Sequence, residues 1–236
     1  MHDGRHGSPA LDHRPDAEPD MRLTVHTFLT LDGVMQGPGG PEEDTSGGFT
    51  AGGWMTAFGG PDFGAVVDSW FTRTAALLLG RTTYQAFAGF WPQVTDPENT
   101  VAVAINAMPK HVVSTTLPEQ DWTGTRVVRP ADGGAVEQVR RILDAGGPDD
   151  ELQVHGSHRL ARTLHDAGLV DEYRLLTFPV VLGQGKRLFD TGSAPSGFQV
   201  VETAVVDDVA TYHVLRPVPL EAPREFAVED GREVTR

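Results

Sequence analysis

Short apolar runs alternate with stretches of helical spacing between residues 21 and 216, and this alternation constrains the fold more than any other feature. The apolar runs predict strands over 23–31, 75–79, 110–114, 126–129 and 152–155, and the amphipathic stretches predict helices over 62–74, 82–90, 136–145 and 156–165. Strands that alternate with helices favour a mainly parallel sheet covered on both faces. The stretches 172–181 and 199–216 have no helix between them, which predicts an antiparallel edge with a break near Asp207 and Asp208.

One domain is expected over residues 21–216, because nothing marks a second core and no internal repeat is visible. Residues 1–20 are polar, Pro-rich and aperiodic, which predicts a disordered leader. Residues 217–236 have a similar composition and predict a loose C-terminal tail.

Composition excludes several classes of function. The chain has no cysteine, so disulfides, zinc–thiolate sites and thiol nucleophiles are ruled out. The net charge of −14 disfavours nucleic acid and anionic membranes as partners. No apolar run approaches the roughly 20 residues of a membrane span, and no signal peptide is recognised, so a cytoplasmic protein is expected. A phosphorylated ligand would need arginines or backbone N–H groups placed locally against this acidic field.

The sequence LLLGRTTY (77–84) places Gly80 at the end of a buried strand and Arg81, Thr82 and Thr83 at the start of a helix. Free N–H groups and the helix dipole attract an anion there, and a guanidinium suits phosphate. A tight turn with an ordinary threonine N-cap explains the same residues.

Two further strand ends carry small polar residues. Ser114 and Thr115 follow the strand at 110–114, where ligands of open sheets gather, although hydroxyls that cap a strand end look the same. Gly156 and Ser157 lie between a strand and a helix, where the backbone can approach a pyrophosphate closely. Three such ends together favour a long phosphorylated ligand, a nucleotide cofactor, across one edge of the sheet.

Other motifs are weaker. His155 and His158 lie across a bend without a carboxylate cluster, so no metal site is expected. The stretch 180–189 superficially resembles a phosphate loop, but its spacing fits a glycine-rich β turn better. Asp32, at a strand end before a glycine, either orients the loop or helps a proton move, and Asp-Gly turn formation explains it as well.

The ordered motifs TLDGVMQGPGG, EEDTSGGF, LLLGRTTY, NAMPKHVVSTTL, VHGS and LVDEYRL, followed by PVVLGQGKRLF, resemble the dihydrofolate reductase-like superfamily. The similarity is greatest to the bacterial branch related to the C-terminal reductase domain of the riboflavin-pathway bifunctional deaminase/reductase, and it covers about residues 21–216. It implies a three-layer α/β fold with a mostly parallel, twisted sheet of about eight strands and a C-terminal antiparallel hairpin. It also implies an NADPH-dependent oxidoreductase that transfers a hydride to a small heterocycle such as a pyrimidine or pterin.

The resemblance assigns roles to named positions. Arg81, Thr82 and Thr83 correspond to the 2′-phosphate site, Gly80 before them is also a cofactor-binding position, and Ser114 and Thr115 correspond to the adenosine site. The pyrophosphate falls at Gly156, Ser157, His158, Arg159 and Leu160. Gly37 falls on the loop over the nicotinamide, and Phe49 and Trp54 fall near the substrate mouth, with Asp32 as the candidate proton donor.

Two departures from the family pattern bear on function. The position of the substrate-binding acid of folate reductases falls on Val67, with Asp68 one residue away, which argues against folate as the substrate. Ser157 stands where the family usually has a second glycine. A reductase of a specialised metabolite and a non-catalytic nucleotide-binding or interaction protein therefore remain alternatives. The family resemblance further suggests a homodimer.

Overall fold

The computed structural model describes residues 21–130 and 134–235, so the predicted leader at 1–20 lies outside the described residues. Its strands are β1 (Met21–Thr30), β2 (Thr74–Gly80), β3 (Lys110–Val113), β4 (Thr125–Val128), β5 (Asp150–His155), β6 (Glu172–Phe178), β7 (Gly197–Val206), β8 (Ala210–Val218), β9 (Phe226–Glu229) and β10 (Arg232–Thr235). Its α-helices are α1 (Pro61–Trp70), α2 (Arg81–Phe90), α3 (Thr100–Ala107), α4 (Gly134–Asp144) and α5 (His158–Asp166).

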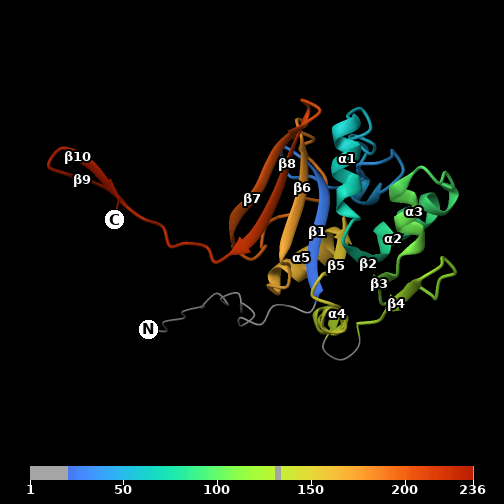
Figure 1. Ribbon diagram of the computed structural model, residues 1–236. Coiled ribbons are helices and arrows are strands. Elements are labelled where there is room, and N and C mark those ends of the chain that lie inside the picture. The colour runs from blue at the N-terminus through green and yellow to red at the C-terminus, as the bar shows by residue number, and fades with distance from the viewer. Residues whose placement is uncertain (1–20, 131–133, 236) are drawn as a thin grey trace.

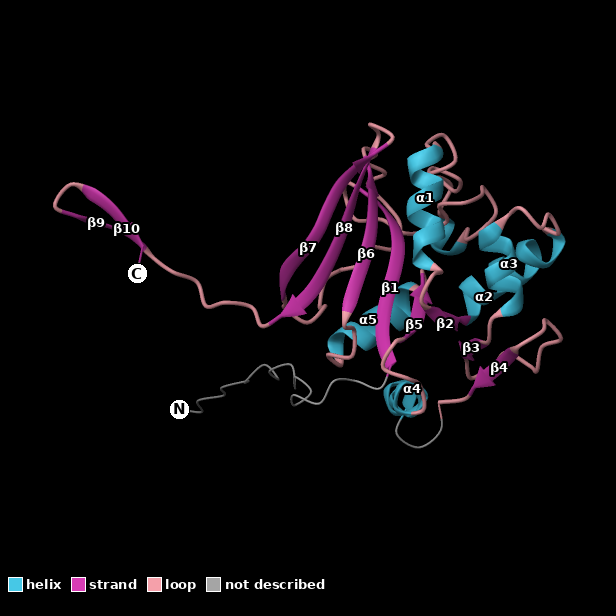
Figure 2. Ribbon diagram, in the orientation of Figure 1, coloured by secondary structure: helices cyan, strands magenta, loops and turns pink. Residues whose placement is uncertain are grey.

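Eight strands form one sheet in the order β4-β3-β2-β5-β1-β6-β8-β7. The pairs from β4 to β6 are parallel, and β8 pairs antiparallel with both β6 and β7. The predicted fold class is therefore confirmed, including the antiparallel edge. Figure 2 shows the sheet as one twisted layer with helices on both sides.

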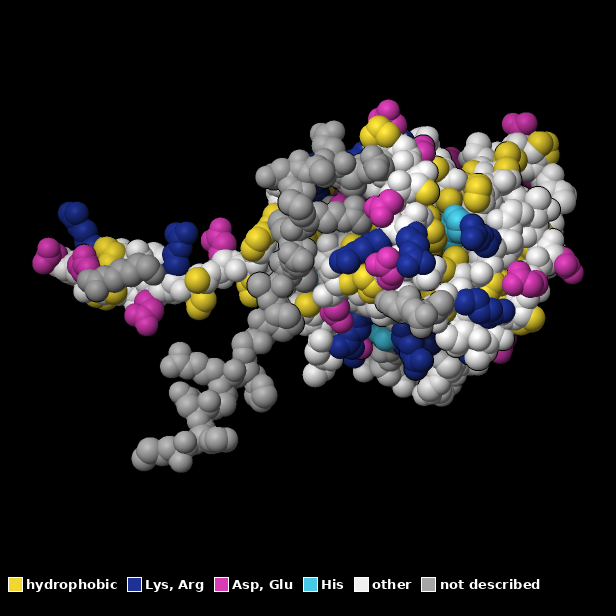
Figure 3. Space-filling model, turned by 90° about the horizontal axis from the view of Figure 1, so that it is seen from below, with side chains coloured by type: hydrophobic (Ala, Val, Ile, Leu, Met, Phe, Trp, Pro, Cys, Tyr) yellow, Lys and Arg dark blue, Asp and Glu magenta, His cyan; other side chains and the backbone are white. Residues whose placement is uncertain are grey.

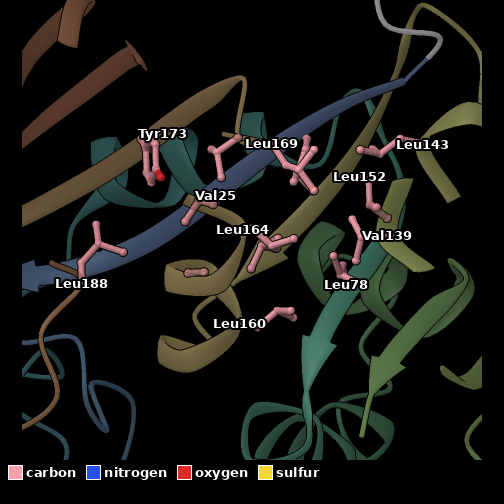
Figure 4. Packing of buried hydrophobic residues seen from close by; sticks show 14 of the residues in the cluster. Val25, Leu78, Val139, Leu143, Leu152, Leu160, Leu164, Leu169, Tyr173 and Leu188 are labelled. Carbon is pink, nitrogen blue, oxygen red and sulfur yellow. The ribbon is translucent and has the colours of Figure 1, made fainter. Parts of the chain in front are cut away.

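The two faces of the sheet bury separate clusters. On one face, leucines and valines of β1 and β5 pack against α4 and α5, as the side chains Leu160, Leu164, Val139 and Leu143 show in Figure 4. On the other face, α1 covers β6 and β8 through Trp70, and α2 and α3 cover β2 and β3. Strand β2 contributes to both faces, which explains why its sequence is continuously apolar rather than alternating.

Residues 207–209 join β7 and β8, and their turn is centred on Asp207 and Asp208, near the break that the sequence predicted. Both residues have positive φ (49° and 56°), as hairpin turns that match strand twist require. The Asp207 carboxylate also accepts hydrogen bonds from the N–H groups of Asp62 (3.2 Å) and Phe63 (2.7 Å), so it caps α1 from a remote strand. Only glycine fits at position 60, since a Cβ there would lie 2.4 Å from that carboxylate.

Several boundaries differ from the sequence predictions. The helix predicted over 62–74 ends at Trp70, and Thr74 already belongs to β2. Gly80, not a threonine, is the N-cap of α2, and it makes no side-chain cap hydrogen bond. Helix α3, capped by the Asn99 side chain, was not predicted, because its β-branched residues carry no helical stripe that stands out.

The C-terminal tail contains regular structure. β8 takes in Pro217 and Val218, and β9 and β10 form a sheet of their own. Figure 1 shows this hairpin on an extended arm away from the eight-stranded sheet, and Figure 3 shows hydrophobic side chains on the arm's surface. Phe226 and Val228 are about three-quarters exposed (76% and 77%).

Nowhere in residues 21–130 and 134–235 does a helix have the length and apolarity needed to cross a membrane.

Candidate functional site

Two strand-to-helix turns meet at the carboxyl edge of the sheet. The Ser157 hydroxyl, after β5, accepts the Gly80 N–H at 2.8 Å and donates to Thr83 Oγ1 at 3.0 Å. Gly156 lies beside the same threonine, since a Cβ at 156 would be 3.7 Å from its side chain. The structure thus brings Gly80, Thr83, Gly156 and Ser157, four of the predicted cofactor-binding residues, together at one edge of the sheet.

Backbone conformation at this junction is unusual. Gly156 and Ser157 both have positive φ, at 62° and 61°, and Ser157 is left-handed at ψ 61°. A non-glycine residue in this region costs about 1–2 kcal/mol. The hydrogen bonds of the Ser157 hydroxyl to Gly80 and Thr83 stabilise this left-handed conformation. The same two bonds connect the turn after β5 to the turn after β2.

The amino ends of α2 and α5 are available for an anion. Neither helix receives a side-chain cap hydrogen bond, so the N–H groups of their first turns are not satisfied by capping. Free N–H groups and the positive end of the helix dipole favour phosphate. Because two such ends meet beside two small residues, the site fits a pyrophosphate-containing cofactor.

Arg81 adds a positive charge at this edge. The exposed guanidinium donates from Nη1 to Thr116 Oγ1 at 2.8 Å, which directs it toward the loop after β3. Thr82, which follows Arg81, and Thr115, which precedes Thr116, are also exposed. Arg81 is therefore exposed and can meet a second anionic group.

Ser114 has a local structural role. Its hydroxyl oxygen accepts the N–H groups of Thr116 (3.2 Å) and Leu117 (3.0 Å), and its side chain is buried. Arg129, which sequence reasoning missed, donates to the carbonyls of Ser114 (3.2 Å) and Leu117 (2.6 Å). Its place directly after the β4 strand was the available signal. Arg81 and Arg129 thus hold the 114–117 loop from two sides.

The three residues after Ser157 have different environments. His158 Nε2 is buried without a hydrogen-bond partner and lies 3.4 Å from Asp190 Oδ2. Arg159 is exposed, whereas Leu160 is buried in the core cluster of Figure 4. Leu160 can therefore serve a ligand only through its backbone.

Asp32 joins two loops at the same edge. Its carboxylate accepts the Thr30 hydroxyl (2.6 Å) and the N–H groups of Leu182 (3.2 Å) and Gly183 (2.8 Å), and Arg187 Nη2 lies 3.3 Å away. These hydrogen bonds, that from Thr30 foremost, lower the pKa of Asp32 to about 2. The 180–189 stretch is a glycine turn, with Gly183 at φ 73°.

Gln36 organises the long loop that follows. Its buried amide accepts the Lys186 N–H (3.0 Å) and donates to the carbonyls of Asp44 and Ser46 (both 3.0 Å). Trp54 Nε1 donates to the Gln36 carbonyl at 2.9 Å. The sequence contained no sign of this role, because a single glutamine forms no motif.

The residues assigned to the loop and substrate mouth are now placed. Gly37 has φ 56° and Phe49 is buried (4% exposed) beside Gly185, whereas Trp54 is partly exposed and packs edge-on against Phe178. Trp54 is thus the more accessible of the two candidate substrate residues.

An aromatic group surrounds His155, the last residue of β5. Its ring lies within 5.2–6.4 Å of the ring centroids of Phe28, Trp70, Phe71 and Phe87. Burial lowers the pKa of His155 to about 4, so its imidazole is neutral at pH 7. All these rings except Trp70 are partly exposed.

Position 67 carries no acid, as the sequence showed. Val67 packs against the cluster under α1, and the Asp68 carboxylate accepts the Thr100 hydroxyl at 2.6 Å on the exposed side of the helix. No carboxylate is among the side chains whose rings or hydrogen bonds contact His155 in the described chain.

Comparison with known proteins agrees with this architecture. The RibD C-terminal domain matches residues 22–211. The uncharacterized protein YyaP of Bacillus subtilis is 29% identical over 170 residues, covering 71% of this chain and 80% of YyaP.

Solved structures share the fold. A putative riboflavin biosynthesis protein from Shewanella sp. PV-4 superposes with a TM-score of 0.60 at 21% identity, over 84% of this chain and 99% of that one. A diaminohydroxyphosphoribosylaminopyrimidine deaminase/5-amino-6-(5-phosphoribosylamino)uracil reductase from Thermotoga maritima gives 0.56 at 16%, over 84% and 57%. Dihydrofolate reductase from Enterococcus faecalis, complexed with NADP(H) and RAB-propyl, gives 0.52 at 13%, over 83% and 96%. The chain therefore belongs to the RibD C-terminal domain family, and it shares its reductase-like fold with these solved structures.

Proposed function

We propose that this protein is an NADPH-dependent reductase of a small, flat heterocycle such as a pyrimidine or pterin. One observation carries the proposal: Ser157 holds two uncapped helix ends together at the carboxyl edge of the sheet, next to the exposed guanidinium of Arg81. The similar dihydrofolate reductase is complexed with NADP(H), which supports the same cofactor here.

Different residues of the chain would bind different parts of the cofactor. The backbone N–H groups at the start of α5, from His158 to Leu160, would meet the pyrophosphate, and Arg81 with Thr82 would meet the 2′-phosphate. Ser114 would support the adenosine end by fixing its loop. When bound, NADPH supplies the hydride, and the protein supplies alignment and exclusion of water.

Asp32 acts as a loop anchor in this proposal. A carboxylate with a pKa of about 2 has no proton to give at neutral pH, and its oxygens already accept four hydrogen bonds. We propose that it keeps the 180–189 turn beside the loop containing Gly37, so that the edge over the nicotinamide stays formed.

The substrate would lie against the partly exposed aromatic residues under α1, with Trp54 at its mouth. Flat rings stack favourably on such side chains. Phe49, which is buried, would act by shaping the loop beneath.

Arg81→Ala tests the cofactor assignment, with Arg140→Ala on the exposed side of α4 as the matched control. Losing a charge-assisted bond of about 1.5–3 kcal/mol should weaken NADPH binding roughly 10- to 100-fold and NADH binding much less. Equal losses for both cofactors would count against the 2′-phosphate role, and no NADPH binding to the unaltered protein would refute the function.

A non-catalytic nucleotide-binding protein is the main alternative, because position 67 lacks an acid. NADPH oxidation screened against folate, pteridine and ribityl-pyrimidine substrates, and against specialised metabolites, separates the possibilities. NADPH binding without turnover of any of these would favour the alternative.

A further inference from the structure

Four arginines lie around two buried glutamates at the amino end of the parallel strands, and we call this group the arginine cluster. Its members are Arg22 of β1, Arg73 directly before β2, Glu151 of β5, Glu172 and Arg174 of β6, and Arg216 of β8. Six residues of chain separate Glu151 from Ser157, about 20 Å in extended backbone. The cluster is therefore remote from the cofactor edge, and the proposed function does not use it.

The two glutamates hold two of the arginines closely. Arg174 donates from Nη2 to Glu151 Oε1 and from Nε to Glu172 Oε1, both at 2.9 Å. Arg216 donates from Nε and Nη2 to Glu172 Oε2 at 3.3 and 3.2 Å. The charges of Arg174 and Arg216 are thus balanced by the two carboxylates.

Arg22 and Arg73 carry the surplus positive charge of the cluster. Arg22 Nη2 and Arg73 Nε each lie 3.8 Å from Glu151 Oε1, beyond hydrogen-bond distance, and their side chains are 28% and 44% exposed. Glu151 itself is completely buried, so these two guanidinium groups and not the glutamate face the solvent. The Asp149 carboxylate lies 3.7 Å from Arg73 Nη2, but it is entirely exposed, and surface pairs of this kind contribute little.

The two surplus guanidinium groups are spaced for one shared ligand. Because both approach the same oxygen, Arg22 Nη2 and Arg73 Nε are at most 7.6 Å apart, which is twice 3.8 Å. Two hydrogen bonds of about 2.9 Å with one phosphate group between them can bridge nitrogens up to about 8 Å apart. The planar fork of a guanidinium matches the oxygens of a phosphate. Arg73 is also held in place, since its Nη2 donates to the Asp149 carbonyl at 3.2 Å.

We propose that Arg22 and Arg73 form a second anion site, which binds one phosphate group, free or esterified, at the amino end of the sheet. The chain has a net charge of −14, so a local surplus of positive charge is the place on its surface to which a dianion is drawn. A bound dianion also reduces the repulsion between the two guanidinium groups. The site lies at the other end of β5 from the cofactor edge, so it does not depend on the proposed function.

A phosphate titration of the full chain, followed by amide NMR shifts, tests the proposal because the shifts locate each bound ion. Sodium phosphate is compared with sodium chloride at equal ionic strength, and glycerol 2-phosphate tests whether an esterified phosphate is accepted. The test variants are Arg22→Gln/Arg73→Gln and Arg22→Lys/Arg73→Lys. The control is Arg140→Gln/Arg141→Gln, which removes two exposed positive charges from α4.

Phosphate should shift the amides of residues 22, 73 and 149–151 with a dissociation constant on the order of 1 mM, as expected for a few charge-assisted hydrogen bonds to one small ion. Shifts at 80–83 and 156–160 report binding at the cofactor edge separately. The glutamine variant should bind phosphate at the cluster roughly 10-fold or more weakly, and the lysine variant, which keeps the charge but not the fork, roughly 3-fold. The control should bind it unchanged.

Four results would overturn the proposal: no shift at the cluster with phosphate, equal shifts with chloride, unchanged phosphate affinity in the folded glutamine variant, or an equal loss in the control. The last would show that general surface charge, and not this pair of arginines, attracts the ion. Thermal unfolding in chloride verifies that each variant is folded, and the lysine variant carries the test if the glutamine variant is not.

Discussion

Replacing Ser157 should separate backbone strain from hydrogen bonding at the cofactor edge. Ser157→Ala keeps the left-handed conformation (φ 61°, ψ 61°) but deletes the hydroxyl that accepts the Gly80 N–H and donates to Thr83. Leaving a partly buried N–H without a partner costs about 1–3 kcal/mol. Ser157→Ala should therefore lower the free energy of unfolding by that amount.

Ser157→Gly loses the same hydrogen bonds but relieves the strain. Relief contributes about 1–2 kcal/mol, and the greater freedom of glycine in the unfolded chain takes back about 0.4–1 kcal/mol. Ser157→Gly should thus be more stable than Ser157→Ala by about 1 kcal/mol. Both variants should bind NADP⁺ more weakly, because the two helix ends are no longer fastened together.

Urea unfolding and NADP⁺ titration measure the two effects. Asp208 supplies the control: it has φ 56° in the remote β7–β8 turn, so Asp208→Gly should exceed Asp208→Ala in stability without changing NADP⁺ affinity. If Ser157→Ala unfolds like the unaltered protein, the fastening role is wrong. If Ser157→Gly is no better than Ser157→Ala while the Asp208 pair differs, the strain argument is wrong.

Four further changes test other parts of the structure. Asp32 has its pKa lowered from 3.8 to about 2, so its contribution to stability is present above about pH 4 and lost as pH falls through about 2; Asp32→Asn should flatten acid unfolding in that window, measured by thermal melts across pH. Lys110 is completely buried and donates to three backbone carbonyls at 2.8–3.2 Å, so Lys110→Met should cost about 2–4 kcal/mol in urea unfolding. Glu151→Gln removes a buried charge-assisted hydrogen bond to Arg174, which keeps Glu172 as its other partner at 2.9 Å, so a loss of about 1.5–3 kcal/mol is expected by the same assay. Removal of residues 220–236 should leave the thermal midpoint unchanged, because β9 and β10 form a separate sheet; light scattering on the same sample tests whether this arm joins the homodimer suggested by the family resemblance.

The fold could be predicted because its main signals are local. An unbroken apolar run such as AALLL requires burial on both faces, and β2 does contribute Leu78 to one cluster and Leu77 to the other. The hairpin break at Asp207 and Asp208 was visible for the same reason, since those residue types tolerate positive φ. Helix α3 was not predicted, because its threonine and valine residues have low helix propensity. Its stability comes from packing against α2 and the Trp91 region.

The site could be predicted only in part. Gly80, Thr83, Gly156 and Ser157 were found because each lies at a strand end, and parallel strands bring such ends to one edge. The uses of Asp32 and Ser114 were left open, because their hydrogen-bond partners come from residues that only the folded loops bring near. His155 was visible but without a role, since its four aromatic neighbours come from β1, α1, the residue after α1, and α2.

Strand β5 runs from the buried ion pair of Glu151 to the edge of the sheet where the Gly156–Ser157 turn lies. Near its start Glu151 pairs with Arg174, Gln153 continues on the same face, and His155 ends the strand beside the strained turn. Strain at a turn persists only where the surrounding structure over-determines it. Because β5 lies between β1 and β2 and is buried along most of its length, its end is held in place from both sides, and the left-handed Ser157 can be maintained there. The same burial lowers the pKa of the histidine at this end to about 4, so its imidazole is neutral beside the Gly156–Ser157 turn.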